Sequence, residues 1–205
     1  MSGLQFPKIG FLASHNGTNM RAVVAACRNG SVKATPAVLV SNNRDSAAMS
    51  WAVDNGLAAI HVSAKSTGSE DSADAAIVSA LRAHGADLVI LAGYMRKLGP
   101  RTLAAFPRRI LNAHPALLPK FGGQGMYGAH VHTAVLAAGE AETGVTIHLV
   151  DDVYDHGAVL AQTRVPVMSG DTPEILAARV QAQEQILFPG VLQRIISGEI
   201  DLDHV

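Results

Sequence analysis

Short apolar runs alternate along the first half of the chain with segments whose apolar residues recur at helical spacing. The apolar runs predict strands over 8–14, 36–42, 58–63 and 87–93. The segments between them predict helices over 20–30, 44–56 and 69–85. Ser69 is the expected N-cap of the last helix, and Gly85 is expected to end it. Because the run 87–93 is almost continuously apolar, it is typical of a strand that is buried on both faces.

The second half of the chain is less regular. The pattern predicts strands over 109–115, 143–151 and 158–167, and a helix over 129–139. A long amphipathic helix is expected over 172–198. We expect this helix to be interrupted near Pro189, because proline lacks an N–H group and crowds the preceding turn.

This order of elements predicts the fold class. Strands that alternate with helices are typical of an α/β protein with a doubly wound, mainly parallel sheet flanked by helices. The closely spaced strands of the C-terminal part predict antiparallel additions to that sheet. The sequence contains no repeat, low-complexity tract or linker, so a single domain over 1–205 is expected.

Composition narrows the class of protein. Hydrophobic residues make up 48% of the chain and charged residues 16%, which favours a packed core over disorder. A formal net charge of -1 without a Lys/Arg run gives no reason to expect a nucleic-acid partner. No apolar run approaches the ~20 residues that span a bilayer, and the N-terminal stretch lacks a signal-peptide pattern. The single cysteine, Cys27, excludes an internal disulfide and fits a cytoplasmic location.

The loop after the first predicted strand is a candidate anion site. Ligands of open α/β sheets lie at the carboxyl ends of strands, where a helix N-terminus offers unpaired N–H groups. Gly17 lets the backbone approach an anion closely, and Thr18 and Asn19 supply side-chain donors. The loop matches neither GxGxxG nor GxxxxGK[ST], so a dinucleotide or nucleoside triphosphate is not expected. A capped turn without a ligand explains the same residues equally well.

Two polar residues lie at the carboxyl end of the strand predicted over 109–115. Strand alternation places Asn112 and His114 on the same face, and Pro115 and Pro119 fix the exit of the chain. An amide NH₂ and an imidazolium that point at one place are suited to stabilise a developing oxyanion. Each residue alone is more simply explained as structural, but the pair on one face favours a functional role.

An acidic cluster supplies a third kind of group. Asp151, Asp152 and Asp155 lie just before Gly157 at the end of a predicted strand. A solvated acidic turn is the usual explanation. In a functional interpretation one of these carboxylates lies beside His114, raises its pKa and relays protons. The spacing does not indicate which one.

Other polar residues remain ambiguous. His148 alternates within its predicted strand, and a structural role is the simpler interpretation. Gln181 and Glu184 lie one helical turn apart, as in a polar helix face or a substrate clamp. His130 and His132 do not share a helical face and have no evident third ligand, so no metal site is predicted.

Several motifs together resemble one known family. The motifs are "SHNGTN", "LAGYMRKL", "ILNAHPALLPKFGG", "TGVTIHLVDDVYDHG", "LAQTRVPV" and "RVQAQEQILFP". Their order is similar to that of the phosphoribosylglycinamide formyltransferases, the folate-dependent glycinamide ribonucleotide transformylases of purine synthesis. The resemblance covers nearly the whole chain and implies the formyltransferase fold. The Asn-Ala-His-Pro-x-Leu-Leu-Pro run and the later Asp-x-Gly are shared by the wider formyltransferase family, whereas "SHNGTN" and "RVQAQE" indicate this branch.

The resemblance implies transfer of a formyl group from 10-formyltetrahydrofolate to the amine of glycinamide ribonucleotide, without a metal. The implied catalytic residues are Asn112, His114 and Asp155. The implied ribonucleotide-binding residues are Gly17, Thr18, Asn19, Gln181 and Glu184. The implied folate-binding residues are Met95, Arg96, Lys97, Leu98, Asn112 and Asp151. A homodimer is compatible with the resemblance.

The implied mechanism is direct transfer. The substrate amine attacks the formyl carbon, and Asn112 and protonated His114 stabilise the tetrahedral oxyanion. Asp155, alone or through a water molecule, helps to move the proton from the amine towards the departing folate nitrogen.

The chain departs from the family pattern in two places. The better-known members have a basic residue near the folate in the segment before the third helix, and here "KSTGSEDSAD" offers only Lys65. The stretch "KFGGQGMYGAHVHTAV" is longer than the compact loop of those members. Its glycines predict a mobile lid over the substrate, and they are Gly122, Gly123, Gly125 and Gly128.

Three alternatives compete with this interpretation. A methionyl-tRNA formyltransferase shares the chemistry but carries an additional C-terminal RNA-binding domain, for which this chain has no basic signal. A formyltetrahydrofolate hydrolase places water where the amine sits, and its usual N-terminal regulatory domain is not expected here. A non-catalytic folate- or nucleotide-binding module does not need all three catalytic residue types. Their joint presence favours an enzyme.

Overall fold

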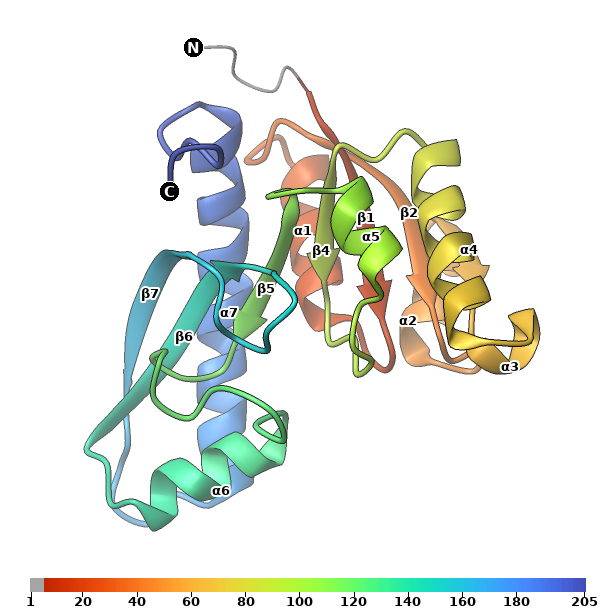
Figure 1. Cartoon of the computed structure of the whole chain (residues 1–205). Helices are drawn as coiled ribbons and strands as arrows, with labels where there is room; N and C mark the ends of the chain where they lie inside the picture. Colours follow the sequence, from red (N-terminus) through yellow and green to blue (C-terminus); the bar gives the residue numbers. More distant parts are fainter. Residues whose placement is uncertain (1–5) are drawn as a thin grey trace.

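A central sheet with helices on both faces forms the body of the protein (Figure 1). The computed structural model describes residues 6–205, so residues 1–5 of the predicted single domain lie outside the described part. The sheet has seven strands in the order β3-β2-β1-β4-β5-β6-β7. The predicted α/β class, with a mainly parallel sheet and antiparallel strands in the C-terminal part, is confirmed.

The strands are β1 (Lys8–Ala13), β2 (Thr35–Ser41), β3 (Ala58–His61), β4 (Leu88–Leu91), β5 (Ile110–His114), β6 (Glu142–Leu149) and β7 (Val159–Pro166). The helices are α1 (Thr18–Arg28), α2 (Ala47–Asp54), α3 (Ala64–Thr67), α4 (Glu70–Ala83), α5 (Pro100–Ala105), α6 (Ala129–Ala137) and α7 (Pro173–Ile196). None of the helices between residues 6 and 205 combines the length and apolar character that crossing a membrane requires.

The strand order places the loops after β1, β4 and β5 at one edge of the sheet. Strand β1 lies between β2 and β4, and all three are parallel. Strand β5 continues the parallel part beside β4, and β6 then pairs antiparallel with β5. Since the chain leaves the sheet in two directions at β1 and β4, a crevice at their carboxyl ends is the expected ligand site of such a sheet.

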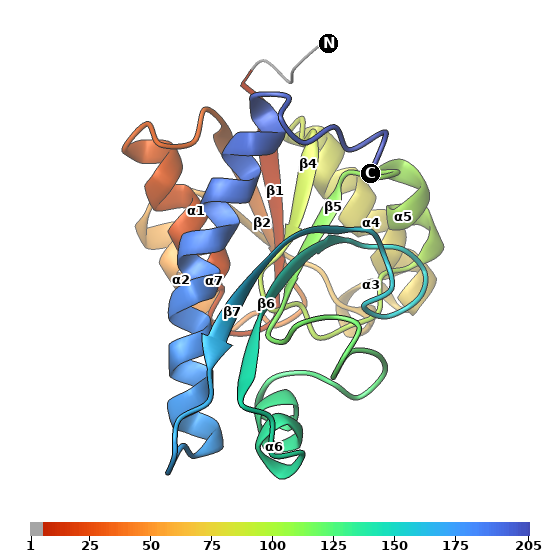
Figure 2. The same cartoon turned by 90° about the vertical axis from the view of Figure 1, so that its left-hand side faces the viewer.

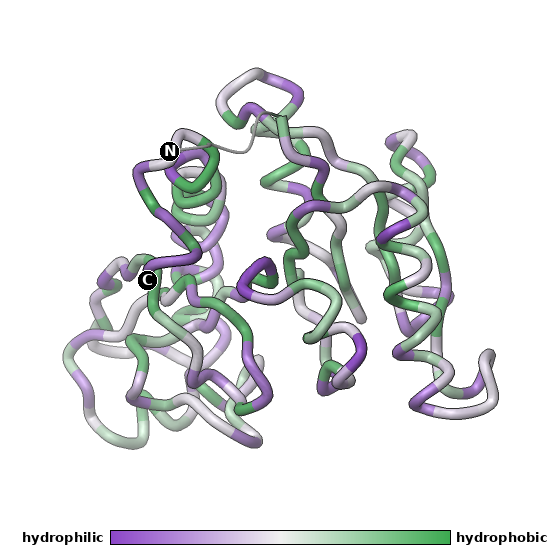
Figure 3. The backbone as a smooth tube through the Cα atoms, turned by 45° about the horizontal axis from the view of Figure 1, so that its top comes forward, coloured by the Kyte–Doolittle hydropathy of each residue, from purple (hydrophilic) through white to green (hydrophobic). Residues whose placement is uncertain are grey.

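Alternate residues of the central strands face two separate hydrophobic cores. Leu88 and Ile90 of β4 belong to the core that also contains buried residues of α1, α2 and α7. Val89 and Leu91 belong to the core on the other face, with buried residues of α4. The prediction that this strand is buried on both faces is therefore confirmed. In the hydropathy-coloured tube, the colours alternate along the covering helices, as expected for helices with one buried side (Figure 3).

The predicted interruption of the last helix is wrong. Helix α7 is continuous and contains Pro189 within it, and it runs as one long rod beside β7 and α1 (Figure 2). Proline removes one backbone donor and strains the turn before it. Phe188 on one side and Val191 and Leu192 on the other are buried in the core, so packing on both sides of the proline holds the helix together.

Two short helices were not expected from the pattern. Helix α3 begins with a capping box in which the side chains of Ser63 and Ser66 each bond the other's backbone N–H. Helix α5 begins directly at Pro100, a residue suited to the first helical position. The predicted N-cap of α4 is confirmed, because the Ser69 side chain accepts a hydrogen bond from the backbone N–H of Ser72.

Candidate active site

Strand β5 presents Asn112 and His114 on one face at the carboxyl edge of the sheet. The antiparallel register pairs Asn112 with His148 and His114 with Thr146 of β6. Directly paired residues of neighbouring strands have their side chains on the same face, within contact distance. The alternation expected from the sequence therefore brings the amide and the imidazole together, with a second histidine opposite the amide.

Asp155 is the acid that lies beside His114. Its Oδ2 atom is 3.4 Å from Nδ1 of His114, and its Oδ1 atom is 3.6 Å from Nε2 of His148. Asp151 instead pairs with the exposed His156, at 3.0 Å between Oδ2 and Nδ1. Asp152 is exposed. Of the three acids that the sequence left open, only Asp155 joins Asn112 and His114 in this cluster.

A tight turn brings Asp155 to this position. A Cβ atom at Gly157 would lie 1.9 Å from the carbonyl oxygen of Leu149, so only glycine fits where the loop folds back against β6. Asp155 itself has a φ of 54°, a left-handed conformation that aspartate tolerates better than most residues. The backbone N–H of Leu149 then bonds the carbonyl of Ala158 and closes the loop.

The glycine-rich loop lies against the same cluster. Nε2 of His114 bonds the carbonyl oxygen of Phe121 at 2.8 Å. The backbone N–H of Gly123 donates to Oδ2 of Asp155 at 2.9 Å. Burial lowers the pKa of His114 below its usual value, and the Asp155 carboxylate and the Phe121 carbonyl act in the opposite direction. The loop is therefore part of the electrostatic environment of His114.

His148 is a site residue that sequence reasoning missed. It is buried, its Nε2 atom lies 3.2 Å from Nδ2 of Asn112, and its Nδ1 atom lies 2.8 Å from the carbonyl oxygen of Leu149. Alternation alone gave no reason to separate it from a core histidine. The signal that identifies it is the cross-strand register with Asn112, which the sequence does not show.

A third buried histidine, His132 of α6, also lies close enough for the charge of His114 to affect its pKa. Burial lowers the pKa of His132, and the nearby His114 lowers it further. Its Nδ1 atom is buried without a hydrogen-bond partner in the structure. Within residues 6–205, no three side chains of the types His, Cys, Asp and Glu are arranged to hold a metal ion.

The loop after β1 leaves the N-terminus of α1 open. Gly17 is the N-cap in a left-handed conformation, with a φ of 60° and no side-chain cap. A side chain at this position would be strained, and its Cβ would lie 3.0 Å from Cβ of Ala48. Unpaired N–H groups at a helix N-terminus form an anion site. The alternative of a turn capped by Thr18 or Asn19 is not what the structure shows.

Helix α7 lies directly against this loop. Nδ2 of Asn19 donates to Oε2 of Glu184 at 3.2 Å, and Nε2 of Gln181 lies 3.5 Å from Oγ1 of Thr18. Burial raises the pKa of Glu184 to about 7, and the bond from Asn19 acts against this shift. The predicted anion loop and the predicted clamp on α7 are therefore in direct contact.

The loop after β4 lies between the anion loop and the acidic loop. Oγ of Ser14 accepts a hydrogen bond from the backbone N–H of Met95 at 2.8 Å, which ties the two loops together. Met95 and Tyr154 are exposed apolar side chains. Nζ of Lys97 lies 5.7 Å from the ring centroid of Tyr154. Exposed apolar side chains and a cation therefore lie together at the carboxyl ends of the strands.

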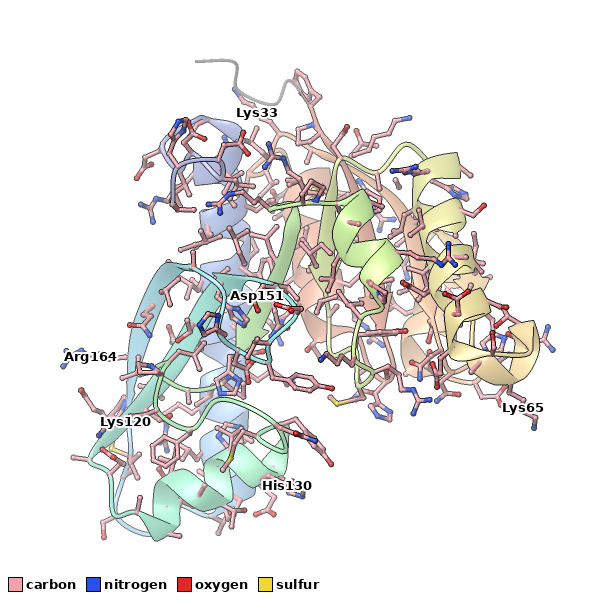
Figure 4. The ribbon with its side chains drawn as sticks, viewed as in Figure 1. Lys33, Lys65, Lys120, His130, Asp151 and Arg164 are labelled. Atoms are coloured by element: carbon pink, nitrogen blue, oxygen red, sulfur yellow. The ribbon has the colours of Figure 1, made fainter. Side chains whose placement is uncertain are left out.

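Not every residue expected at the folate has a free side chain. Leu98 is buried in the core beside α4, and Arg96 is ion-paired with Glu70. Lys65 is the basic residue that the sequence offers in the segment before the third predicted helix. It lies on α3 at the right-hand edge of the molecule, whereas Asp151 lies near the centre, beside β5 (Figure 4).

A hollow of about 460 Å³ lies at the opposite edge of the sheet. Asp87 and Arg109, which precede β4 and β5, are among its lining residues. The polar cluster described above lies at the carboxyl ends of the same strands. We therefore locate the candidate site by its cluster of polar side chains and by the strand topology, and not by the size of a hollow.

Comparison with known proteins shows the family of the chain. The family described as formyl transferase matches residues 7–192. The chain is 41% identical over 194 residues to the chloroplastic phosphoribosylglycinamide formyltransferase of Arabidopsis thaliana, covering 94% of this chain and 66% of that protein. It is 34% identical to the phosphoribosylglycinamide formyltransferase of Escherichia coli (strain K12), covering 93% of this chain and 88% of that protein. The chain thus spans about two thirds of the length of the plant relative.

Solved structures give the same result. The crystal structure of glycinamide ribonucleotide transformylase 1 from Symbiobacterium toebii superposes with a TM-score of 0.89 at 37% identity, covering 95% of this chain and 89% of that one. A formyltetrahydrofolate deformylase from Pseudomonas syringae superposes with a TM-score of 0.83 at 22% identity over 95% of this chain and 62% of that one, which shows a shared fold. The chain belongs to the formyl transferase family, among the relatives of the phosphoribosylglycinamide formyltransferases.

Proposed function

We propose that this protein transfers the formyl group of 10-formyltetrahydrofolate to the amine of glycinamide ribonucleotide, as a cytoplasmic enzyme of purine biosynthesis. The observation that carries the proposal is the convergence of Asn112, His114 and Asp155 at the carboxyl edge of β5. His114 and Asp155 are 3.4 Å apart, and Asn112 joins them through His148. An amide donor, an imidazole and a carboxylate are the groups that direct acyl transfer to an amine needs.

The two substrates approach this cluster from two sides. The open N-terminus of α1 at Gly17 binds the phosphate of the ribonucleotide through backbone N–H groups. Gln181 and Glu184, which lie against Thr18 and Asn19, contact the ribose and the amine end. These contacts hold the nucleophile near Asn112, and holding two reactants in this way supplies much of the rate.

The folate occupies the other side of the crevice. Met95 and Lys97, in the loop after β4, border the pterin with exposed side chains, and Asp151 borders it from the acidic loop. Arg96 and the buried Leu98 contribute the backbone of the same loop. Met95 and Tyr154 provide exposed apolar surface for a planar ring, and Lys97 offers a cation to an anionic tail.

The reaction then proceeds by direct attack. The free amine of the ribonucleotide attacks the formyl carbon, and negative charge develops on the formyl oxygen. The amide NH₂ of Asn112 and the protonated imidazole of His114 stabilise that charge. Asp155 favours the charged form of His114 and accepts the proton that the attacking amine loses. Collapse of the intermediate breaks the bond from carbon to the folate nitrogen, and that nitrogen takes up the proton that Asp155 accepted, which restores the carboxylate.

The open N-terminus of α1 favours the transferase over the hydrolase alternative. A formyltetrahydrofolate hydrolase uses water as acceptor and has no need for an anion site beside its catalytic residues. Here the anion site at Gly17 is linked to the crevice through Ser14, which bonds the loop after β4.

Three substitutions test the catalytic assignment. Asn112→Ala, His114→Ala and Asp155→Asn should each lower kcat by about 10²–10⁴-fold in an assay with both substrates. Asp152→Asn is the matched control, because Asp152 is an exposed acid of the same loop, and it should leave kcat unchanged. Wild-type rates in the three variants would refute the assignment.

A further inference from the structure

The imidazole of His148 has two different polar neighbours at its two nitrogen atoms. Nδ1 lies 2.8 Å from the carbonyl oxygen of Leu149, and Nε2 lies 3.2 Å from Nδ2 of Asn112. Oδ1 of Asp155 is more distant, at 3.6 Å from Nε2. The ring is buried in the sheet, so its own contacts decide its protonation state and tautomer.

These neighbours select one tautomer. A carbonyl oxygen can only accept, so Nδ1 of His148 must carry the hydrogen that it donates to Leu149. In the neutral ring Nε2 then has a free lone pair, which accepts from the NH₂ group of Asn112. The reversed amide would place the carbonyl oxygen of Asn112 against that lone pair, two acceptors facing each other. The neutral ring therefore fixes which end of the amide points to His148.

The surroundings of His148 favour the neutral ring. Burial lowers its pKa, and the charge of His114 lowers it too, whereas the Leu149 carbonyl and the carboxylates of Asp155 and Asp151 raise it. On its other side, β7 places Val159 opposite His148, a residue without charge. The net direction is a pKa below the usual value for histidine.

We propose that His148 is a positioning residue: as the neutral Nδ1–H tautomer, it holds the Asn112 amide so that its second N–H faces the formyl oxygen. The inference rests on the proposed role of Asn112 in the oxyanion site. An amide NH₂ has two hydrogens, and one of them is occupied by His148. The second hydrogen then points in a fixed direction before the reaction begins. A donor that needs no reorientation stabilises a developing oxyanion most effectively.

Protonation of His148 would undo this arrangement. A proton on Nε2 occupies the lone pair and makes Nε2 a hydrogen-bond donor. It would then donate to Oδ1 of Asp155 and no longer accept from Asn112. The amide of Asn112 would lose its acceptor and its fixed orientation. The wild-type rate should therefore fall at acid pH, with a midpoint at the pKa of His148.

The tautomer is directly measurable by ¹⁵N NMR of the histidine rings in the whole protein. The His148 signals are identified as those lost in His148→Gln. His84 is the internal control, because its Nδ1 atom also bonds a backbone carbonyl, that of Ala80 at 2.8 Å, far from the site in sequence and structure. We expect a neutral Nδ1–H ring for His148 at neutral pH. A neutral Nε2–H ring or an imidazolium at that pH would overturn the inference.

A double-mutant cycle tests the link to Asn112. His148→Leu should lower kcat by up to about 10²-fold in the wild-type background, with little change in either KM. In the Asn112→Ala background the same change should have almost no effect. His148→Gln, whose side-chain carbonyl can accept from the amide, should keep most of the activity.

The cycle separates failure of the inference from failure of the proposed function. If Asn112→Ala alone leaves kcat unchanged, the proposed role of Asn112 is wrong. If Asn112→Ala is impaired but His148→Leu has an equal effect in both backgrounds, or none in either, the positioning role of His148 is wrong. If His148→Leu does not fold, the NMR measurement of the His148 tautomer in the wild-type protein still tests the positioning role.

Discussion

Nε2 of His114 lies 2.8 Å from the carbonyl oxygen of Phe121, while Nδ1 of the same ring faces Oδ2 of Asp155 at 3.4 Å. Both neighbours are acceptors, so the two ring nitrogens are placed to donate two hydrogens, as an imidazolium does. The Phe121 carbonyl thus accepts from a group that the oxyanion of the intermediate would use. In the proposed reaction, that hydrogen of His114 would pass from the Phe121 carbonyl to the oxyanion, so the position of the glycine-rich loop is coupled to the state of His114.

Removal of residues 124–127 tests whether the glycine-rich loop acts as the lid that the sequence predicts. The deletion shortens the loop without removing Phe121 or Gly123, whose backbone groups contact His114 and Asp155. We expect a higher KM or a lower kcat, because a loop that closes over the site excludes water and holds the substrates. Steady-state kinetics measure the effect. Gln124→Ala, a change at an exposed position of the same loop, is the control. Unchanged kinetics in the deletion variant would defeat the lid hypothesis.

Asp155→Asn should lower the pKa of His114 and slow formyl transfer. Burial already lowers this pKa, and the Asp155 carboxylate opposes the effect of burial. Without this carboxylate, burial lowers the pKa of His114 further, so a smaller fraction of His114 is protonated at a given pH. NMR titration of His114 measures the shift, with Asp152→Asn as the matched control. A His114 titration that is indifferent to Asp155→Asn would refute the electrostatic link.

Gly17→Ala should weaken binding of the ribonucleotide. The left-handed φ of 60° and the approach to Ala48 at 3.0 Å strain any side chain there, by about 1–3 kcal/mol. We expect a rise in the KM of glycinamide ribonucleotide of about tenfold or more, with the folate KM nearly unchanged. Gly30→Ala is the control, since Gly30 has a φ of 81° and open space around it, just beyond the C-terminus of α1. Equal effects of both changes on KM would argue against an anion site at Gly17.

Lys97→Ala should weaken folate binding more than Lys65→Ala does. Lys97 lies over the ring of Tyr154 at the crevice, whereas Lys65 lies at the far edge of the molecule (Figure 4). An exposed cation contributes up to about 1 kcal/mol, or roughly fivefold in affinity, and less at high salt. Titration with folates that carry one or several glutamates measures the difference. A larger effect of Lys65→Ala would place the anionic tail near α3.

Glu184→Gln should change how stability depends on pH. The folded protein raises the pKa of Glu184 from 4.5 to about 7, so the proton is bound more tightly in the folded state than in the unfolded chain. This contribution to stability is full below pH 4.5, declines as pH rises to about 7 and is then lost. At pH 8 the variant should be more stable by up to about 3 kcal/mol, and at pH 4 nearly unchanged. Urea unfolding at the two pH values measures this, and a stabilisation that is equal at both would contradict the assignment.

Much of the fold was predictable because local patterns and packing agree. The run at 88–91 is apolar throughout, and β4 is buried on both faces. Alternation alone placed Asn112 and His114 together. Pro189 shows where local patterns fail, because the core contacts of Phe188 and Val191 outweigh the local effect of a proline.

The rest of the site depends on contacts between distant segments. The pairing of His148 with Asn112 follows from the register of two antiparallel strands, 36 residues apart in sequence. The choice of Asp155 among three acids follows from the turn at Gly157. The contact between Phe121 and His114 follows from the path of a loop. None of these relationships has a periodic signal in the sequence.

The proposed reaction is tested most directly by the rate of tetrahydrofolate formation from 10-formyltetrahydrofolate, with glycinamide ribonucleotide present or left out. We expect turnover only with the ribonucleotide, and loss of that turnover in Asn112→Ala, His114→Ala and Asp155→Asn. Equal turnover without the ribonucleotide would mean that water is the acceptor, and no turnover in either case would contradict the proposed reaction.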